Sequence, residues 1–203
     1  MKNNIQKITH ILCDLSDVLI KGIEGSEIPL AKEIGLDEKK VSEELFSYNF
    51  RPLWLGKINE YDFASKLIKE KNWDISTERF LEIIKENFQE IKGVKDVYLR
   101  LKKKYTLILL SVNAKEWVNY LDKKYNYSGL FDKVVYSFDI GYTKREPESF
   151  AYVLDILKIS PEKLFLIDDS SRNLAVAEAL GIKGIKFLDA KQLKDSLSNL
   201  NII

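Results

Sequence analysis

Residues 8–20 read ITHILCDLSDVLI, an apolar run interrupted by two aspartates, Asp14 and Asp17. The part from Ile8 to Leu15 is short and rich in branched aliphatic side chains, without clean alternation of apolar and polar residues. This pattern is typical of a strand that helices cover on both faces of a sheet. The stretch therefore predicts a buried parallel strand with a carboxylate, that of Asp14, at its carboxyl end.

Four further runs of the same kind follow along the chain, at Thr106–Val112, Lys133–Ser137, Leu164–Ile167 and Gly184–Phe187. Helical patterns lie between them. Val94–Lys104 precedes the second strand, Pro147 opens a helix after the third, and Ser171–Leu180 follows the fourth and is closed by Gly181. This alternation of strands and helices predicts a doubly wound α/β fold with a parallel sheet.

The segment between the first two strands is far longer than the dozen or so residues that a crossover needs. Asp37 is placed like a helix N-cap, and apolar stripes at helical spacing recur at Val41 and Leu45, at Phe63 and Leu67, and at Phe80 and Ile84. We expect residues 21–92 to form an inserted helical cap, and residues 1–20 with 93–203 to form the α/β core. A cap at this place would lie over the strand ends where such sheets bind ligands.

The composition of the 203 residues narrows the chemistry. The 32 Lys and Arg against 31 Asp and Glu give a formal net charge of +1, which argues against a dedicated binder of nucleic acid or membrane surfaces. One cysteine and one histidine exclude an internal disulfide framework, a cysteine-rich zinc site and a multi-histidine metal centre. No apolar stretch reaches the roughly 18–20 residues of a membrane span, and cysteine usage fits a reducing compartment, so we expect a cytoplasmic protein. Carboxylates, lysine, serine and a hard cation are left for catalysis.

Polar residues follow four of the predicted strands where each ends. They are Asp14, Ser16 and Asp17 after the first strand, Ser111 and Asn113 after the second, Lys144 after the third, and Asp168, Asp169 and Asn173 after the fourth. Each alone is more often structural, because Asp and Ser cap helices and Lys covers surfaces. The carboxyl ends of parallel strands share one edge of a sheet, so the four groups together predict an active site there.

These four segments resemble, in order, the motifs of the haloacid dehalogenase superfamily, and the resemblance covers nearly the whole chain. The first motif of that family, Asp-x-Asp-Gly-(Val/Thr)-Leu, is similar to residues 14–19, and the second, a strand that ends in Ser or Thr, to residues 107–113. The third, Gly-x-x-Lys-Pro-x-Pro-x-x-(Phe/Tyr), is similar to residues 141–150, and the fourth, an acidic pair with a polar residue further on, to residues 168–173. The helical insertion resembles the family's class I cap, of the subfamily IA kind.

The resemblance implies a phosphatase-type hydrolase that uses Mg²⁺ and acts on a small phosphorylated metabolite, such as a sugar phosphate, through an aspartyl-phosphate. Asp14 would be the nucleophile, and Lys144 and Ser111 would complete the catalytic set and bind the phosphate. The family pattern places Mg²⁺ on the Asp14 carboxylate, the backbone carbonyl of Ser16 and Asp169. It also assigns supporting positions to Asp168 and Asn173 and a substrate contact to Asn113.

Three residues leave questions open. Ser16 stands where the family's phosphatases have a second Asp, a general acid and base whose role is typically worth about 10²–10⁴ in rate. Activity can then persist on substrates with good leaving groups, Asp17 can take over the role, or the chemistry differs. Arg145 replaces a proline of the family pattern and either faces solvent or adds a charge toward the substrate. Arg51, in the insertion, is the candidate for a polar substrate contact, and the alternative is that it covers neighbouring aromatic rings.

Two other functions therefore stand beside the Mg²⁺-dependent phosphatase. A metal-independent 2-haloacid dehalogenase would use Asp14 to attack carbon, but the acidic pair of Asp168 and Asp169 has no role in that reaction. A catalytically weakened phosphate-binding protein would keep the shape of the site and lose turnover through Ser16. The expected partner in the leading hypothesis is a small phosphorylated molecule, not a nucleic acid or a membrane.

Overall fold

A five-stranded parallel sheet forms the centre of the molecule, in the strand order β3-β2-β1-β4-β5. The structure, a computed structural model, describes residues 8–203. Its strands are β1 (His10–Cys13), β2 (Thr106–Ser111), β3 (Lys133–Tyr136), β4 (Leu164–Asp168) and β5 (Lys183–Lys186). All five coincide with the predicted strands to within a few residues, and the predicted doubly wound α/β fold is confirmed.

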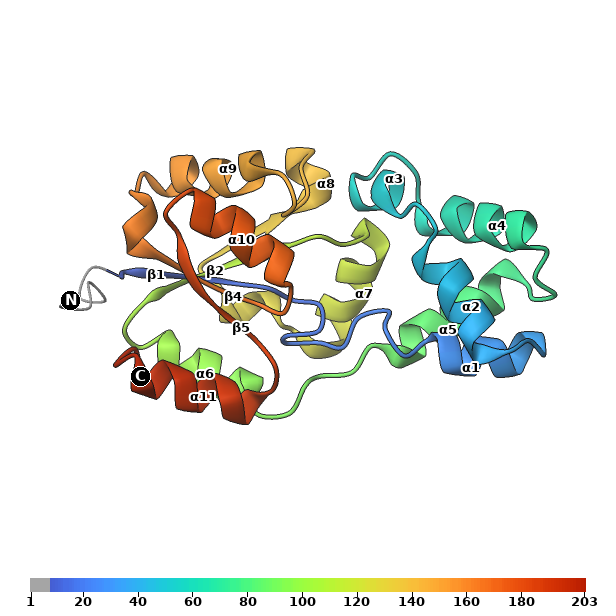
Figure 1. Cartoon of the computed structure of the whole chain (residues 1–203), viewed down its shortest axis with the longest axis horizontal. Coiled ribbons are helices and arrows are strands. Elements are labelled where there is room, and N and C mark those ends of the chain that lie inside the picture. Colours follow the sequence, from blue (N-terminus) through green and yellow to red (C-terminus); the bar gives the residue numbers. More distant parts are fainter. Residues whose placement is uncertain (1–7) are drawn as a thin grey trace.

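Helices cover both faces of this sheet (Figure 1). One face packs on α9 (Pro147–Leu157) and α10 (Ser171–Ala179), and the other on α6 (Val94–Leu101), α7 (Lys115–Tyr125) and α11 (Ala190–Asn199). Alternate residues of a strand point to opposite faces. Leu12 of β1 accordingly joins the cluster with α9 and α10, whereas Ile11 and Cys13 join the other. Burial on both faces explains why the three central strands, β1, β2 and β4, are mostly apolar in sequence, whereas the edge strands β3 and β5 carry exposed lysines.

Five helices lie between β1 and α6, away from the sheet (Figure 1). They are α1 (Glu27–Ile34), α2 (Glu38–Phe46), α3 (Arg51–Trp54), α4 (Glu60–Lys71) and α5 (Thr77–Asn87). Asp37 is the N-cap of α2, as predicted, and its side chain accepts a hydrogen bond from the backbone N–H of Lys40. The two connections to the sheet run side by side, because the N–H of Lys21 donates to Gln89 O at 2.8 Å. The boundaries at residues 20/21 and 92/93 stay a prediction.

Short elements complete the chain. They are α8 (Ser137–Ile140) and the 3₁₀ turns η2 (Ser128–Leu130) and η3 (Pro161–Lys163). Pro147 is the first residue of α9, where its missing N–H costs nothing. Gly181 follows α10 with φ of 85°, a left-handed conformation that favours glycine. Within residues 8–203, no helix combines the length and the apolar character that crossing a bilayer requires.

Candidate active site

The carboxyl ends of three neighbouring strands bring the predicted polar residues together. Asp14 directly follows β1, Ser111 ends β2 and Asp168 ends β4, and β1 pairs with both other strands. The fourth group comes from the turn before α9, where the N–H of Glu146 donates to Thr143 O at 3.0 Å and Lys144 lies inside the turn. These four segments, distant in sequence, therefore meet at one edge of the sheet, as expected for a doubly wound fold.

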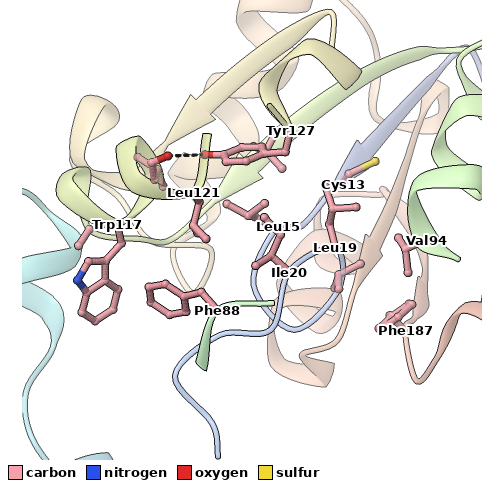
Figure 2. Packing of buried hydrophobic residues seen from close by; sticks show 14 of the residues in the cluster. Cys13, Leu15, Leu19, Ile20, Phe88, Val94, Trp117, Leu121, Tyr127 and Phe187 are labelled. Atoms are coloured by element: carbon pink, nitrogen blue, oxygen red, sulfur yellow. Dashed lines mark hydrogen bonds between the residues drawn. The ribbon is translucent and has the colours of Figure 1, made fainter. Parts of the chain in front are cut away.

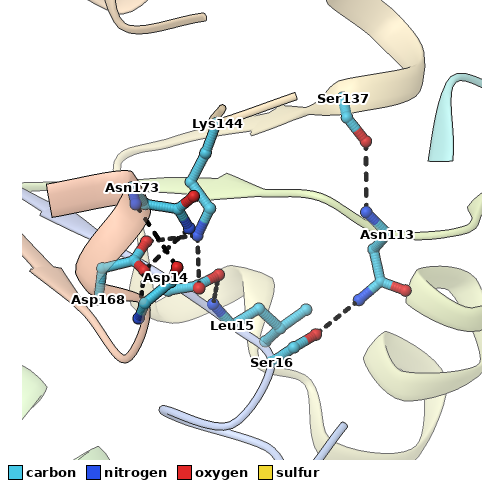
Figure 3. Close-up of polar contacts among 9 residues, drawn as sticks. Asp14, Leu15, Ser16, Asn113, Ser137, Lys144, Asp168 and Asn173 are labelled. Atoms are coloured by element: carbon cyan, nitrogen blue, oxygen red, sulfur yellow. Dashed lines mark hydrogen bonds and ion pairs between the residues drawn. The ribbon is translucent and has the colours of Figure 1, made fainter. Parts of the chain in front are cut away.

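Lys144 is the buried cation of this site, with only 3 % of its surface exposed. Its Nζ contacts Asp14 Oδ2 and lies 2.6 Å from Asp168 Oδ2 (Figure 3). Burial alone would lower the pKa of Lys144, but the two carboxylates outweigh it and raise the pKa above its usual range. The lysine is therefore a fixed positive charge between two acidic side chains.

Asp14 is held in one orientation by donors on both of its carboxylate oxygens. Its Oδ1 accepts a hydrogen bond from the N–H of Leu15 at 2.7 Å, and its Oδ2 faces Lys144. Burial raises the pKa of Asp14 to about 8, and the charge of Lys144 offsets only part of that effect. A further cation beside this carboxylate would favour its ionised form, which is the form that can act as a nucleophile.

The two aspartates at the end of β4, Asp168 and Asp169, differ in burial and in hydrogen bonding. Asp168 is fully buried. Its Oδ2 contacts Lys144, and its Oδ1 accepts hydrogen bonds from Ser170 N at 2.9 Å and Asn173 Nδ2 at 3.0 Å. Asp169 is half-buried and lines the cavity above the site. Burial, with the nearby charge of Asp168, raises the pKa of Asp169.

Three carboxylates of the site are close enough to hold a metal ion. Asp14, Asp168 and Asp169 each offer one oxygen, and these oxygens lie within 4.8 Å of one another. A set made of carboxylate oxygens suits a hard cation such as Mg²⁺. Lys144 engages both Asp14 and Asp168, and Asp168 also accepts from Ser170 and Asn173. Asp169 is the most open of the three carboxylates.

Ser111 adds an unsatisfied hydroxyl to the same edge. Its side chain is fully buried, and its Oγ has no hydrogen-bond partner within residues 8–203. A buried polar atom without a partner costs stability unless a ligand completes it. The Ser111 hydroxyl is therefore free to donate a hydrogen bond to a ligand.

Hydrogen bonds connect Ser16 with the helical insertion. The Nδ2 of Asn113 donates to Ser16 Oγ at 3.1 Å, and the backbone N–H of Asn113 donates to Ser137 Oγ at 3.3 Å (Figure 3). Ser137 in turn donates to the backbone oxygen of Trp54, at the end of α3, at 2.5 Å. The side-chain amide of Asn113 is thus engaged by Ser16. The predicted contact of Asn113 with a substrate stays a prediction.

A cavity of about 510 Å³ opens between α3 and the strand ends. Its walls include Asp14, Lys144 and Asp169 from the sheet side and Phe50, Arg51 and Trp54 from the insertion. The exposed Arg145 also lines it. Three residues that depart from the family pattern, Ser16, Asp17 and Arg145, therefore line this cavity.

Arg51 spans from the insertion to the turn that carries Lys144. Both terminal nitrogens of its guanidinium donate to the Glu146 carboxylate at 2.8 Å. Glu146 Oε2 also accepts from the N–H and the hydroxyl of Thr143, at 2.9 and 3.0 Å. The hydrogen bonds from Arg51 lower the pKa of Glu146 to about 2. The predicted contact between Arg51 and a substrate stays a prediction. Neither that prediction nor its alternative, that Arg51 covers aromatic rings, includes the ion pair with Glu146.

Asp17 occupies the position that is glycine in the family pattern. Its φ is 57°, in the left-handed region that glycine tolerates best. Its Oδ1 accepts a hydrogen bond from the N–H of Gly22 at 2.8 Å, which directs the carboxylate toward the start of the insertion. Burial raises the pKa of Asp17 to about 6.

A family model describing haloacid dehalogenase-like hydrolases matches residues 4–181 of this sequence. The chain belongs to this family. The predicted family is thereby confirmed, whereas the subfamily IA character of the cap and the roles of the site residues stay predictions.

Relatives of this hydrolase include a named flavin mononucleotide hydrolase and a named phosphatase. Flavin mononucleotide hydrolase 1 of Arabidopsis thaliana, which carries a chloroplast designation, is 23% identical over 97% of this chain and 79% of its own. D-ribitol-5-phosphate phosphatase of Bacteroides thetaiotaomicron is 23% identical over 87% of this chain and 90% of its own. A solved HAD family enzyme from the same bacterium, in complex with magnesium and inorganic phosphate, is 26% identical with a TM-score of 0.76, covering 90% of this chain and 95% of that one.

Glu146 and Ser137 are not among the site residues predicted from the sequence of this hydrolase. Glu146 directly precedes Pro147 and reads as a helix start, and nothing near it indicates a partner 95 residues away. Ser137 does follow a predicted strand, which is a weak signal of the kind that identified Ser111. Both residues contact α3, whose placement no local sequence pattern indicates.

Proposed function

We propose that this hydrolase is a Mg²⁺-dependent phosphatase that transfers the phosphoryl group of a small phosphorylated metabolite to Asp14. The observation that carries the proposal is the buried contact of Lys144 with Asp14 and Asp168 at the wall of one cavity. A fixed cation beside a carboxylate is what an attack on an anionic phosphate requires. The flavin mononucleotide hydrolase and the D-ribitol-5-phosphate phosphatase among the relatives support the same reaction class.

In the proposed reaction, a carboxylate oxygen of Asp14 attacks phosphorus and the bond from phosphorus to the ester oxygen breaks. Lys144 would hold a phosphate oxygen by charge, and the Ser111 hydroxyl would donate to another. Water then attacks the phosphorus of the aspartyl-phosphate, which releases inorganic phosphate and restores Asp14. Asp168 acts on these steps by holding Lys144, and Asn173 by holding Asp168.

Mg²⁺ fits the oxygen donors that the site offers. Asp14, Asp169 and the backbone carbonyl of Ser16 would hold it. When bound, it supplies positive charge that offsets the repulsion between the substrate phosphate and the carboxylates. The acidic cluster also argues against the dehalogenase alternative, because an attack on carbon has no use for it. The cap boundaries and the cytoplasmic location stay predictions beside this proposal.

Hydrolysis of 4-nitrophenyl phosphate tests the proposed function. We expect turnover with Mg²⁺ and loss of at least nine-tenths of it after chelation, with recovery when Mg²⁺ is restored. Turnover that persists in chelator would contradict the metal requirement. Halide release from a 2-haloacid in chelator would instead establish the dehalogenase. A rise in melting temperature with Mg²⁺ and phosphate, without turnover of any phosphate ester, would establish the phosphate-binding alternative.

Ser16 leaves the proposed reaction without the usual proton donor for the leaving oxygen. We expect Ser16→Asp to raise kcat for alkyl phosphates by at least about tenfold, because a general acid is worth about 10²–10⁴ in such steps. The gain is expected to be smaller for 4-nitrophenyl phosphate, whose leaving oxygen needs no proton. Ser16→Asn is the matched control, since it has the size of Asp but no acid. Equal rates for the two variants would place the acid elsewhere.

A further inference from the structure

A second cavity, of about 180 Å³, adjoins the active-site cavity at Ser16. The two share Ser16, Asp17, Trp54 and Val112 in their walls, so a molecule bound over Asp14 can extend from one into the other. Beyond this junction the walls are mostly apolar, from Ile20, Ile23, Phe88, Trp117 and Leu121. Figure 2 shows Ile20, Phe88, Trp117 and Leu121 gathered on one side of β1.

We propose that this second cavity, the ring subsite, binds a single aromatic ring in the leaving group of the substrate. The inference rests on the proposed phosphatase function and narrows its substrate class to phosphate esters of phenol-like hydroxyls. An apolar cavity of about 150 Å³ is enough to bind benzene. The ring subsite therefore has room for one aromatic ring.

The chemistry of Ser16 favours the same substrate class, phosphate esters of phenol-like hydroxyls. The leaving oxygen departs with the electron pair of its bond to phosphorus as the bond from Asp14 to phosphorus forms. An alkoxide needs a proton at that moment, and Ser16 is a poor acid. A phenoxide is a stable anion that leaves without one and takes its proton from water afterwards. The missing acid and the apolar cavity thus lie at the same place and favour the same leaving group.

The aromatic walls give the ring specific contacts. Trp117 packs edge-on against Trp54 with ring centroids 5.4 Å apart, and against Phe88 at 5.5 Å. Trp117 and Phe88 are at most 2 % exposed. Such a fixed aromatic lining favours a ring over a flexible alkyl chain, because edge-to-face pairs add to the burial of apolar surface. Lys21, which is exposed to solvent, also lines the ring subsite.

The first test uses the unaltered protein with Mg²⁺ and three substrates, phenyl phosphate, 1-naphthyl phosphate and acetyl phosphate. Phenol and naphthol have nearly the same acidity, so these two esters differ in size and not in leaving ability. We expect kcat/KM for phenyl phosphate to exceed that for 1-naphthyl phosphate at least tenfold. Equal values would overturn the ring subsite. Acetyl phosphate has a good leaving group without a ring, so failure to hydrolyse any of the three substrates would contradict the phosphatase function itself.

Two variants with opposite effects on the ring subsite form the second test. Ile23→Trp fills it, and we expect the ratio of kcat/KM for phenyl over acetyl phosphate to fall at least tenfold. Phe88→Leu enlarges it, and we expect the ratio for 1-naphthyl over phenyl phosphate to rise at least threefold. Ile28→Trp, the same change at a residue that is 54 % exposed on α1, should leave both ratios unchanged. Unchanged ratios in the cavity variants would overturn the proposal. If only one of the two variants is soluble, its ratio alone decides.

Discussion

Asp14→Asn is expected to reduce phosphatase turnover by about 10⁴-fold or more, since loss of a covalent nucleophile is among the largest effects that one substitution has on an enzyme. An amide has nearly the size of a carboxyl but no negative charge with which to attack phosphorus. The amide oxygen of this variant can still accept from the N–H of Leu15, and Lys144 keeps its contact with Asp168. The fold should therefore persist while the chemistry stops.

Steady-state rates with 4-nitrophenyl phosphate and Mg²⁺ measure this effect, and the intact mass of protein quenched during turnover detects the aspartyl-phosphate. Asp139→Asn is the matched control, because Asp139 is exposed on α8 and outside both cavities described above. The Asp139→Asn variant should hydrolyse 4-nitrophenyl phosphate at the normal rate, and its intact mass should show the addition of a phosphoryl group. Turnover above one-hundredth of normal in Asp14→Asn would assign the nucleophile to another residue.

Lys144→Met is expected to lower the free energy of unfolding by about 3 kcal/mol at pH 8.5 and to abolish turnover. Removing one member of a buried ion pair leaves the opposite charge without compensation, and such losses typically cost about 3–5 kcal/mol. Here the carboxylates of Asp14 and Asp168 would face each other without the cation between them. Lys144→Arg should not restore activity, because the guanidinium is larger and planar.

The cost of Lys144→Met should shrink as the pH falls. Burial already raises the pKa of Asp14 to about 8 in the presence of the lysine, and removing that positive charge raises the pKa further. A carboxyl whose pKa is raised by folding destabilises the folded protein above that pKa and ceases to do so once protonated. Urea denaturation at pH 8.5 and 5.5 measures the difference. Mg²⁺ should recover part of the loss.

Lys191→Met is the control for this substitution. Its ion pair with Asp195 lies on the surface, where the lysine side chain is 89 % exposed, and such pairs contribute little to stability. We expect no resolved change at either pH. A Lys144→Met protein as stable at pH 8.5 as the original would show that the two carboxylates do not depend on the lysine.

The strands and the residues at their ends could be predicted from sequence because the signals are local. Each apolar run is short, ends at a polar residue and is followed by a helical pattern, and parallel strands bring such ends to one edge whatever the loops do. The positions of Asp14, Ser111 and Asp168 at neighbouring strand ends follow from that rule. The approach of Lys144 to Asp14 is implied by the family resemblance.

Contacts between the insertion and the sheet could not be predicted in the same way. The bond from Ser137 to the Trp54 carbonyl depends on how α3 is placed, which no local pattern encodes. The left-handed backbone conformation of Asp17 could not be predicted from the aspartate itself, because that conformation is typical of glycine. The ring subsite depends on the relative placement of α7, the two connecting segments and Trp54.

The bidentate pair of Arg51 and Glu146 makes the insertion and the sheet specific to each other. Glu146 also holds Thr143, the residue before Lys144, so a replacement at Arg51 reaches the turn that carries the lysine. An insertion transplanted from a relative would need a guanidinium at the same place to satisfy this carboxylate. Exchanging the insertion without the turn would therefore leave the Glu146 carboxylate without its guanidinium partner.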